Sequence, residues 1–153
     1  MADQDIWKPH VTVAAICERD GRFLLVREKI NGIEVLNQPA GHLDPGETLE
    51  QAVIRETLEE TSYRFVPREL SGIYRFLPEQ NSNETHLRFA FSGDTGDCLN
   101  QPLDKGIIAA EWMTLEQIQA SRAQHRSPMV LQCILDYLHE PSYPLQVFSA
   151  AFR

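Results

Sequence analysis

The most informative stretch of this chain is GHLDPGETLEQAVIRETLEE, from Gly41 to Glu60. Its second half is expected to be helical, and Glu56, Glu59 and Glu60 fall at relative positions 0, +3 and +4. At about 100° per residue, these positions span an arc of roughly 100° on one helix face. Like charges at this spacing repel by a few tenths of a kcal/mol per pair. A bound cation removes the repulsion, so the stretch predicts a metal site with oxygen ligands.

The residues ahead of the glutamates indicate where the helix begins. Residues 41–47 are expected to form a loop, because Pro45-Gly46 suits the central positions of a type II turn. Thr48 followed by Gln51 is a capping-box pattern. On a helical wheel the three glutamates continue the apolar stripe that starts at Leu49. We therefore expect a helix that packs with one side and presents carboxylates with the other.

The spacing of these residues resembles the Nudix box, G-x5-E-x7-R-E-U-x-E-E-x-G-U, where U is a bulky apolar residue. Seven of its nine defined positions match, and they are Gly41, Glu47, Arg55, Glu56, Glu59, Glu60 and Tyr63. Thr57 replaces a bulky aliphatic residue, and Ser62 replaces the usual Gly. A left-handed Ser at the helix end costs roughly 1 kcal/mol relative to Gly. Neither departure removes an expected ligand, so we expect an active hydrolase of the Nudix family.

The resemblance implies which residues bind the metal. Glu56, Glu59 and Glu60 would carry the ions, joined by the backbone carbonyl of Ala40. Carboxylates select hard cations, so the expected cofactor is Mg²⁺ or Mn²⁺. The implied reaction is hydrolysis of a diphosphate by a metal-activated water that attacks phosphorus. Either Glu59 or Glu56 would be the general base.

Further charged residues are expected to support this chemistry. Arg55 and Glu47 complete the implied catalytic set, because a guanidinium bridges carboxylates and holds them in register. Some Nudix enzymes use another acidic residue near the last strand. Asp104 and Glu111 are the candidates here. Each is otherwise read as an ordinary surface carboxylate.

Short blocks outside the box resemble the NudJ-type phosphatases, a branch of the same family. They are Lys8–Ala14, Asn37–Asp44, Leu87–Phe89, Arg126–Pro128 and Tyr143–Leu145. Enzymes of this type release phosphate from nucleoside tri- and diphosphates, from thiamin pyrophosphate and from its pyrimidine diphosphate precursor. The resemblance implies this substrate range for the present chain.

Four polar residues are candidates for substrate binding. Arg88 alternates with apolar neighbours in a predicted strand, which leaves a surface arginine and a phosphate-binding arginine both open. Arg126 lies just before a predicted helix, where the helix dipole favours anions. Asn37 and Gln38 precede the metal-binding stretch and would hydrogen-bond a base or pyrimidine.

The rest of the chain predicts a mixed sheet flanked by helices. The expected strands are His10–Cys17, Phe23–Val26, Ile33–Leu36, Glu69–Phe76, Thr85–Ser92 and Ile107–Met113. Asp20-Gly21 and Asn31-Gly32 predict hairpin turns, residues 93–105 a polar loop, and Thr114 and Pro128 the starts of two helices. The family resemblance implies the Nudix fold, an α/β/α sandwich with a mixed β-sheet. It would form one domain over residues 1–153, with its core at about 9–137 and a C-terminal tail at 140–153.

Composition narrows the partners and the compartment. The chain has 153 residues and a formal charge of −8, which argues against nucleic-acid binding and leaves a small-molecule substrate. No stretch approaches the ~20 apolar residues of a membrane span. The polar start predicts no signal peptide, and three unpatterned cysteines predict a reduced, cytoplasmic setting. The apolar tail from Leu145 to Phe152 would pack on the domain or on a second subunit, which leaves a homodimer open.

Other functions stay open at the level of sequence. A Nudix fold also serves as a catalytically silent ligand sensor, and other Nudix enzymes are pyrophosphohydrolases of ADP-ribose or sugar nucleotides. A purely structural cation-binding module is a further alternative. The intact Arg55, Glu56, Glu59 and Glu60 favour catalysis over the silent forms.

Overall fold

The computed structural model describes residues 5–81 and 83–153. Its helices are α1 (Leu49–Thr61), α2 (Leu115–Ala120) and α3 (Met129–His139), accompanied by the 3-10 turns η1 (Arg122–Gln124) and η2 (Leu145–Val147). Its strands are β1 (His10–Arg19), β2 (Arg22–Ile30), β3 (Ile33–Asn37), β4 (Ala40–His42), β5 (Tyr63–Phe76), β6 (His86–Cys98), β7 (Ile107–Thr114) and β8 (Tyr143–Pro144). Among the described residues, no helix is long and apolar enough to cross a membrane.

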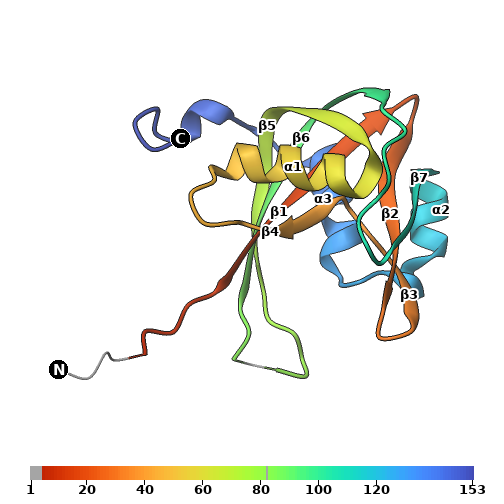
Figure 1. The fold of residues 1–153 in the computed structure, drawn as a ribbon, viewed down its shortest axis with the longest axis horizontal. Coiled ribbons are helices and arrows are strands. Elements are labelled where there is room, and N and C mark those ends of the chain that lie inside the picture. Colours follow the sequence, from red (N-terminus) through yellow and green to blue (C-terminus); the bar gives the residue numbers. More distant parts are fainter. Residues whose placement is uncertain (1–4, 82) are drawn as a thin grey trace.

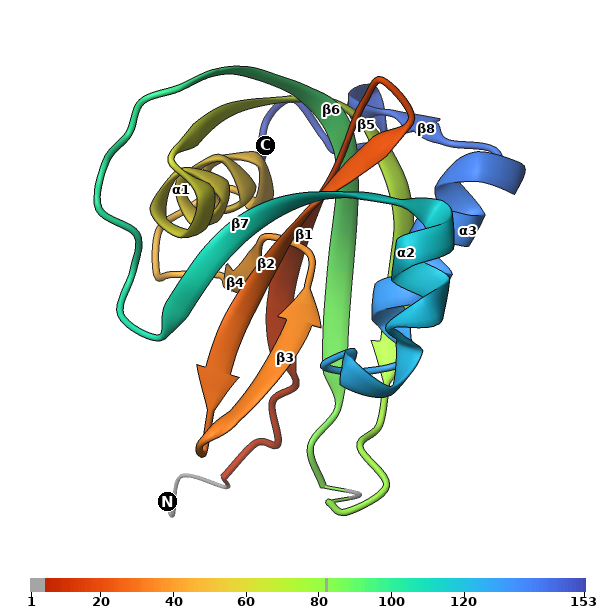
Figure 2. The same cartoon turned by 90° about the vertical axis from the view of Figure 1, so that its right-hand side faces the viewer.

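The strands of the described residues form one 8-stranded sheet that separates α1 from α2 and α3 (Figures 1 and 2). The order is β3-β2-β1-β6-β5-β8, with β4 also on β1 and β7 also on β2. β1 and β6 run parallel, whereas β1 pairs antiparallel with β2 and β4. The expected α/β/α sandwich with a mixed sheet is therefore confirmed.

Two tight turns fold the first three strands into consecutive hairpins. Asp20 and Gly21 have φ of 51° and 72°, and Asn31 and Gly32 have φ of 49° and 80°. Positive φ at both central residues is the type I′ geometry that matches the twist of paired strands. The two predicted hairpins are confirmed, and they bring β2 between β1 and β3.

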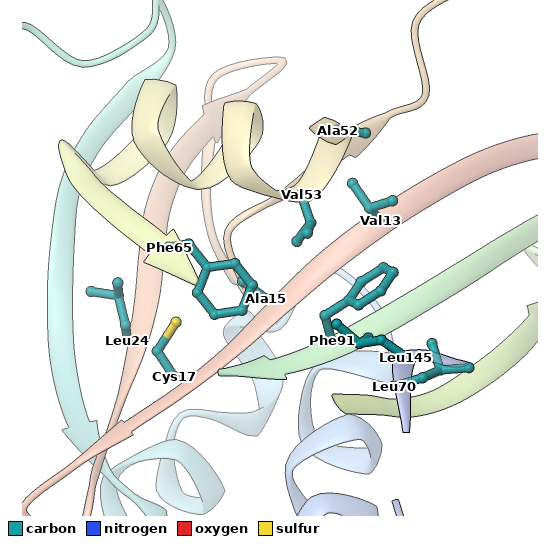
Figure 3. Close-up of a cluster of buried hydrophobic side chains, with 10 residues drawn as sticks. All are labelled: Val13, Ala15, Cys17, Leu24, Ala52, Val53, Phe65, Leu70, Phe91 and Leu145. Atoms are coloured by element: carbon teal, nitrogen blue, oxygen red, sulfur yellow. The ribbon is translucent and has the colours of Figure 1, made fainter. Parts of the chain in front are cut away.

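Strand β1 supplies both faces of the core, because its side chains alternate. Val13 and Ala15 face the layer of α1, where they meet Val53 and Phe91 (Figure 3). Ile16 faces the other way, into the cluster formed with α2 and α3. The apolar residues of β1 are almost fully buried, which is why its sequence lacks the polar alternation of a surface strand.

The structure corrects three predicted boundaries. Strand β6 continues through Cys98, so the loop expected over residues 93–105 covers only 99–106. Strand β5 begins at Tyr63, because its first half pairs with this extension of β6. Ala40–His42 forms a short strand on β1 in place of a loop. Each of these segments is a strand because it pairs with a partner from another part of the chain.

The C-terminal tail packs on its own domain. Leu145 is buried in the cluster beneath α1, and the ring of Phe148 stacks on Phe91 at 5.9 Å between centroids. Arg153 Nε then donates to Glu50 Oε1 at 2.6 Å, which joins the end of the tail to the first turn of α1. Phe152 remains 93% exposed. This packing covers Leu145 and part of Phe148 within one chain, whereas Val147 and Phe152 stay exposed, and the homodimer stays a prediction.

The tail contact predicts a stability difference between two phenylalanines. Phe148→Ala removes a ring packed on Phe91 and is expected to lower the free energy of unfolding by roughly 2–4 kcal/mol. Phe152→Ala is the matched control, because that exposed ring is expected to matter by less than about 0.5 kcal/mol. Urea unfolding of the two variants measures the difference. Equal stability of both would contradict a packed tail.

Candidate active site

The start of helix α1 is fixed by its own sequence. Thr48 Oγ1 accepts from Gln51 N at 3.1 Å, and Gln51 Oε1 accepts from Thr48 N at 2.9 Å. This reciprocal pair confirms the predicted capping box and satisfies two backbone donors at the helix start. The cap sets the rotation at which the later turns present Glu56 and Glu59.

Arg55 is the centre of the ionic network. Its Nε and Nη2 donate to the two carboxylate oxygens of Glu47 at 2.6 and 3.0 Å, a bidentate contact. Its Nη1 donates to Glu56 at 2.8 Å and to Glu59 at 3.2 Å. Nη2 also donates to the carbonyl of His42 at 3.0 Å, which ties the helix to β4. The hydrogen bonds from Arg55 lower the pKa of Glu47.

Glu60 is the most buried carboxylate of the group, at 6% exposure. Its Oε1 accepts a hydrogen bond from the Ala40 amide at 2.7 Å. Burial raises the pKa of Glu60 to about 8 despite that bond, with smaller contributions from Glu28, Glu56 and Asp104. Burial also raises the pKa of Glu56, against the opposing effect of Arg55. Of the two, Glu60 has only a backbone amide as its partner in the described part of the chain.

Gly41 lets the carboxylate of Glu56 approach the backbone of β4. A Cβ at this position would lie 2.1 Å from Glu56 Cδ, far inside any allowed contact. The first glycine of the motif is thus required by the closeness of a carboxylate, since any side chain would push Glu56 aside. Sequence alone placed Gly41 in the motif but gave no reason for it.

Ser62 ends the helix in the predicted left-handed conformation, with φ 62° and ψ 14°. The hydroxyl has a second function: Ser62 Oγ accepts from Gln101 N at 2.7 Å, and Ser62 O accepts from Leu99 N at 2.8 Å. Both partners belong to the loop between β6 and β7. Glycine would supply the helix end but not the hydroxyl contact.

The two additional acidic candidates, Asp104 and Glu111, have different surroundings. Asp104 N donates to the backbone carbonyl of Glu59 at 2.9 Å, and the Asp104 charge helps to raise the pKa of Glu56 and of Glu60. Glu111 pairs opposite Leu25 of β2, whose side chain lies in the cluster with α2 and α3. Its carboxylate contacts Arg27 at 3.0 Å. Asp104 thus joins the site, whereas Glu111 faces away from it.

Glu28 belongs to the acidic group and was missed in the sequence. Leu24, Val26 and Glu28 alternate along β2, and Leu24 lies in the cluster beneath α1. Glu28 therefore shares the face that looks toward the helix, and its charge helps to raise the pKa of Glu60. The sequence signal that could have revealed Glu28 is a carboxylate on the face of the strand that also carries the buried Leu24 and Val26. Arg126 Nη1 pairs with Glu28 Oε1 at 3.0 Å, which places this candidate arginine beside the acidic group.

The other three candidate substrate residues meet each other. Arg88 is 4% exposed, Asn37 8% and Gln38 1%. Arg88 Nη2 donates to Asn37 Oδ1 at 3.2 Å, and Nη1 donates to Gln38 Oε1 at 3.1 Å. Gln38 Nε2 in turn donates to the carbonyl of Val130 at 2.6 Å, next to the start of α3. The expected orientation of Arg88, opposite to Phe89, is what the structure shows, because Phe89 packs on the cluster beneath α1.

Three histidines also gather near Arg126, a feature that the sequence did not indicate. His10 and His86 are opposite each other in the parallel ladder of β1 and β6, with ring centroids 5.0 Å apart. His42 lies 5.5 Å from His10. Burial lowers the pKa of His86, and His10, His42 and Arg126 lower it further. This part of the site gathers imidazole rings beside Arg126, and the lowered pKa favours the uncharged form of His86.

The donor set fits a divalent cation. Glu56, Glu59 and Glu60 are hard oxygen donors, and burial raises the pKa of Glu56 and of Glu60. Within the described ranges, no three acidic, histidine or cysteine side chains are arranged to hold an ion as they stand. Arg55 holds Glu56 and Glu59, and the Ala40 amide holds Glu60. Ala40 contributes its N–H here, and ligation by its carbonyl stays a prediction.

Comparison with known proteins assigns the class. The family model of the NUDIX domain matches residues 7–133. The chain therefore belongs to the Nudix hydrolase family and is an enzyme of that family.

Particular relatives are more informative still. The chain is 39% identical over 144 residues to Phosphatase NudJ of Escherichia coli strain K12, covering 93% of this chain and 92% of that protein. A solved NUDIX hydrolase from Nitrosomonas europaea is 46% identical, with a TM-score of 0.89 and coverage of 93% and 97%. A bifunctional NMN adenylyltransferase/ADP ribose pyrophosphatase from Francisella tularensis, complexed with AMP and a Mn ion, shares only the fold. It is 20% identical, with a TM-score of 0.73 and coverage of 89% and 43%. The resemblance to NudJ-type phosphatases is confirmed.

The close approach of Gly41 predicts a loss of activity without unfolding. Gly41→Ala is expected to displace the Glu56 carboxylate and to lower kcat/KM by about 100-fold, as misplacement by an ångström does elsewhere. Gly96→Ala is the control, because a Cβ there meets nothing within 4 Å. Steady-state kinetics and thermal melts of both variants provide the test. Wild-type activity in Gly41→Ala would refute the steric argument.

The raised pKa of Glu60 predicts a pH-dependent stability. The folded protein holds this proton up to about pH 8, whereas the unfolded chain releases it near the ordinary glutamate pKa of 4.5. The free energy of unfolding therefore falls as pH rises from about 4.5 to about 8. Glu60→Gln keeps an acceptor for Ala40 and removes the titration. In EDTA at pH 8 it is expected to be more stable than wild type by on the order of 2–4 kcal/mol.

The comparison is made by urea unfolding at several pH values. The difference between Glu60→Gln and wild type should shrink toward zero near pH 4.5, where both side chains are neutral in either state. Parallel stability curves across this pH range would show that Glu60 is ionised normally in the folded protein.

Proposed function

We propose that this enzyme is a Mg²⁺- or Mn²⁺-dependent phosphatase acting on nucleoside di- and triphosphates. Thiamin pyrophosphate and its pyrimidine diphosphate precursor are included as related diphosphates. The likeness to Phosphatase NudJ supports the release of phosphate, and the guanidinium of Arg126 suits an anionic substrate.

The observation that carries the proposal is the convergence of carboxylates from three segments. Glu56, Glu59 and Glu60 come from α1, Glu28 from β2 and Asp104 from the loop before β7. Two arginines pair with Glu56, Glu59 and Glu28, but Glu60 has no cationic partner among the described residues, and an uncompensated buried carboxylate is costly. Burial raises the pKa of Glu56 and of Glu60. The group is organised to receive positive charge from outside the chain.

In this proposal Glu56, Glu59 and Glu60 hold the metal. When bound, the metal neutralises phosphate charge and lowers the pKa of a bound water. Arg55 keeps the carboxylates in register through its contacts to Glu47, Glu56 and Glu59. Arg126, held by Glu28, is the exposed cation placed to contact a phosphate group.

Two glutamates stay candidates for the general base. Glu59 has the more exposed side chain, at 39%, and so has access to an attacking water. Glu56 is 14% exposed and lies against Gly41, but its raised pKa brings it closer to neutrality, where a base works best. The base is expected to set the acidic limb of the pH profile of kcat.

The test is release of phosphate and pyrophosphate from a substrate panel with Mg²⁺, Mn²⁺ or EDTA. The panel holds nucleoside tri- and diphosphates, thiamin pyrophosphate, ADP-ribose and a sugar nucleotide. We expect metal-dependent release of orthophosphate from the first three classes. Glu59→Gln and Glu56→Gln are expected to lower kcat by at least about 100-fold. The variant of the true base should also lose the acidic limb of the profile.

Glu111→Gln is the matched control, because Glu111 faces away from the site and pairs with Arg27. It should retain wild-type turnover. Turnover of ADP-ribose or the sugar nucleotide alone would replace the phosphatase assignment by a pyrophosphohydrolase. Binding of nucleotide without any turnover would contradict catalysis and favour a ligand sensor.

A further inference from the structure

Arg88 is a buried arginine without a carboxylate partner. It is 4% exposed, and its two Nη groups donate to neutral amides. Its Nε has no hydrogen-bond partner in the described part of the chain. The neighbouring Cys133 supplies no counter-charge, because burial raises the pKa of that thiol. Burying an arginine in this way is costly, so the arrangement calls for a reason beyond packing.

The guanidinium fixes the orientation of the amide of Asn37. Arginine has only donors, so the Asn37 atom that faces Nη2 at 3.2 Å has to be the oxygen. This assignment follows from chemistry and does not depend on telling oxygen from nitrogen by shape. The Nδ2 group of Asn37 must then point away from Arg88, as a donor.

That donor is free, unlike the corresponding group of Gln38. Gln38 Nε2 is engaged with the carbonyl of Val130 at 2.6 Å. Asn37 Nδ2 has no acceptor among residues 5–81 and 83–153, although Asn37 is only 8% exposed. Asn37 Nδ2 is not among the polar atoms that are both fully buried and unpartnered. This nitrogen is therefore still accessible to solvent.

The register of β3 places Asn37 on the strand face that carries Glu28. Asn37 is opposite Val26 in the β2–β3 ladder, and Val35 is opposite Glu28 two residues along. Directly paired residues and those two apart share one face of a sheet. Asn37 and Glu28 therefore face the same way, and Glu28 borders Glu60 and binds Arg126. A ligand held by the acidic group and Arg126 lies within the reach of this face.

We propose that Asn37 determines specificity by donating a hydrogen bond from Nδ2 to an acceptor atom of the substrate, with Arg88 as the positioning residue that prevents the amide from turning. The inference rests on the proposed function and names the chemistry of the substrate atom. The partner is an oxygen or unprotonated nitrogen, either on the base or on a phosphate. A substrate that presents an N–H there is disfavoured, because two donors would face each other.

Two substitutions remove the donor in different ways. Asn37→Asp keeps the shape and an oxygen for Arg88 but can only accept, so its melting temperature should not fall. Asn37→Ala removes the donor without adding charge. Both should weaken binding of the non-hydrolysable β,γ-imido analogue of UTP at least tenfold in calorimetry and raise KM for UTP similarly. Gln124→Glu is the charge-matched control, because its side chain is exposed and keeps an acceptor for Arg27.

The substrates identify which acceptor is bound. If both variants bind UTP weakly but still bind tripolyphosphate normally, Nδ2 contacts the nucleoside. If the binding of both ligands is weakened, Nδ2 contacts phosphate. Either result supports the proposal. Unchanged binding in both variants would overturn it, and so would a loss confined to Asn37→Asp, which would show charge repulsion alone. If the wild-type protein binds the UTP analogue but does not turn over UTP, the proposed function is refuted. The binding test of Asn37 can still be carried out in that case.

The positioning role of Arg88 has its own readout. Arg88→Lys keeps the charge and loses the planar contact to Asn37 and Gln38. Alone it should weaken binding of the UTP analogue several-fold, but in the Asn37→Ala background it should add no further loss. Equal losses in both backgrounds would show that Arg88 does not act through Asn37.

Discussion

The ionic contacts of Arg55 are the constraint on which the site depends. One guanidinium binds Glu47 bidentately, reaches Glu56 and Glu59 in its own helix, and donates to the carbonyl of His42. Without it, the glutamates would repel one another along one helix face. The network also joins the helix to β4, because the carbonyl that Arg55 contacts belongs to that strand. The same guanidinium thus offsets the charge of the glutamates that it contacts and positions helix α1 on β4.

Strand β1 allows the two halves of the site to meet. It pairs with β2 and β4 on one side and with β6 on the other, so it lies at the centre of the strand order. Acidic residues arrive from α1 and β2, whereas Arg88 arrives from β6 and the amides from the end of β3. An acidic end for the metal and a polar end for the rest of the substrate are thus set by the same sheet.

Local chemistry explains what could be predicted from the sequence. The capping box of Thr48, the left-handed Ser62 and the two hairpin turns each depend on a few neighbouring residues, and all were predicted. Glu28 meets Arg126, 98 residues further along the chain, and Arg88 meets Asn37, 51 residues before it, so spacing alone did not reveal these contacts. The polar half of β6 escaped prediction for the same reason: its state is decided by β5. The motif thus predicted which chemical groups form the site, but their neighbours depend on the topology of the sheet.

The hydroxyl of Ser62 has a consequence for the mobility of the loop that carries Asp104. Three backbone amides of this loop, those of Leu99, Gln101 and Asp104, are bound to the last turn and cap of α1. At about 1 kcal/mol net per bond, detaching the loop costs on the order of 3 kcal/mol. A detached loop is then populated at only about one percent. On the opposite side, Arg126 is held by a half-exposed ion pair, a contact typically worth less than about 1 kcal/mol. The loop that carries Asp104 is therefore held in place by its backbone, whereas the guanidinium of Arg126 is free to change its partner at little cost.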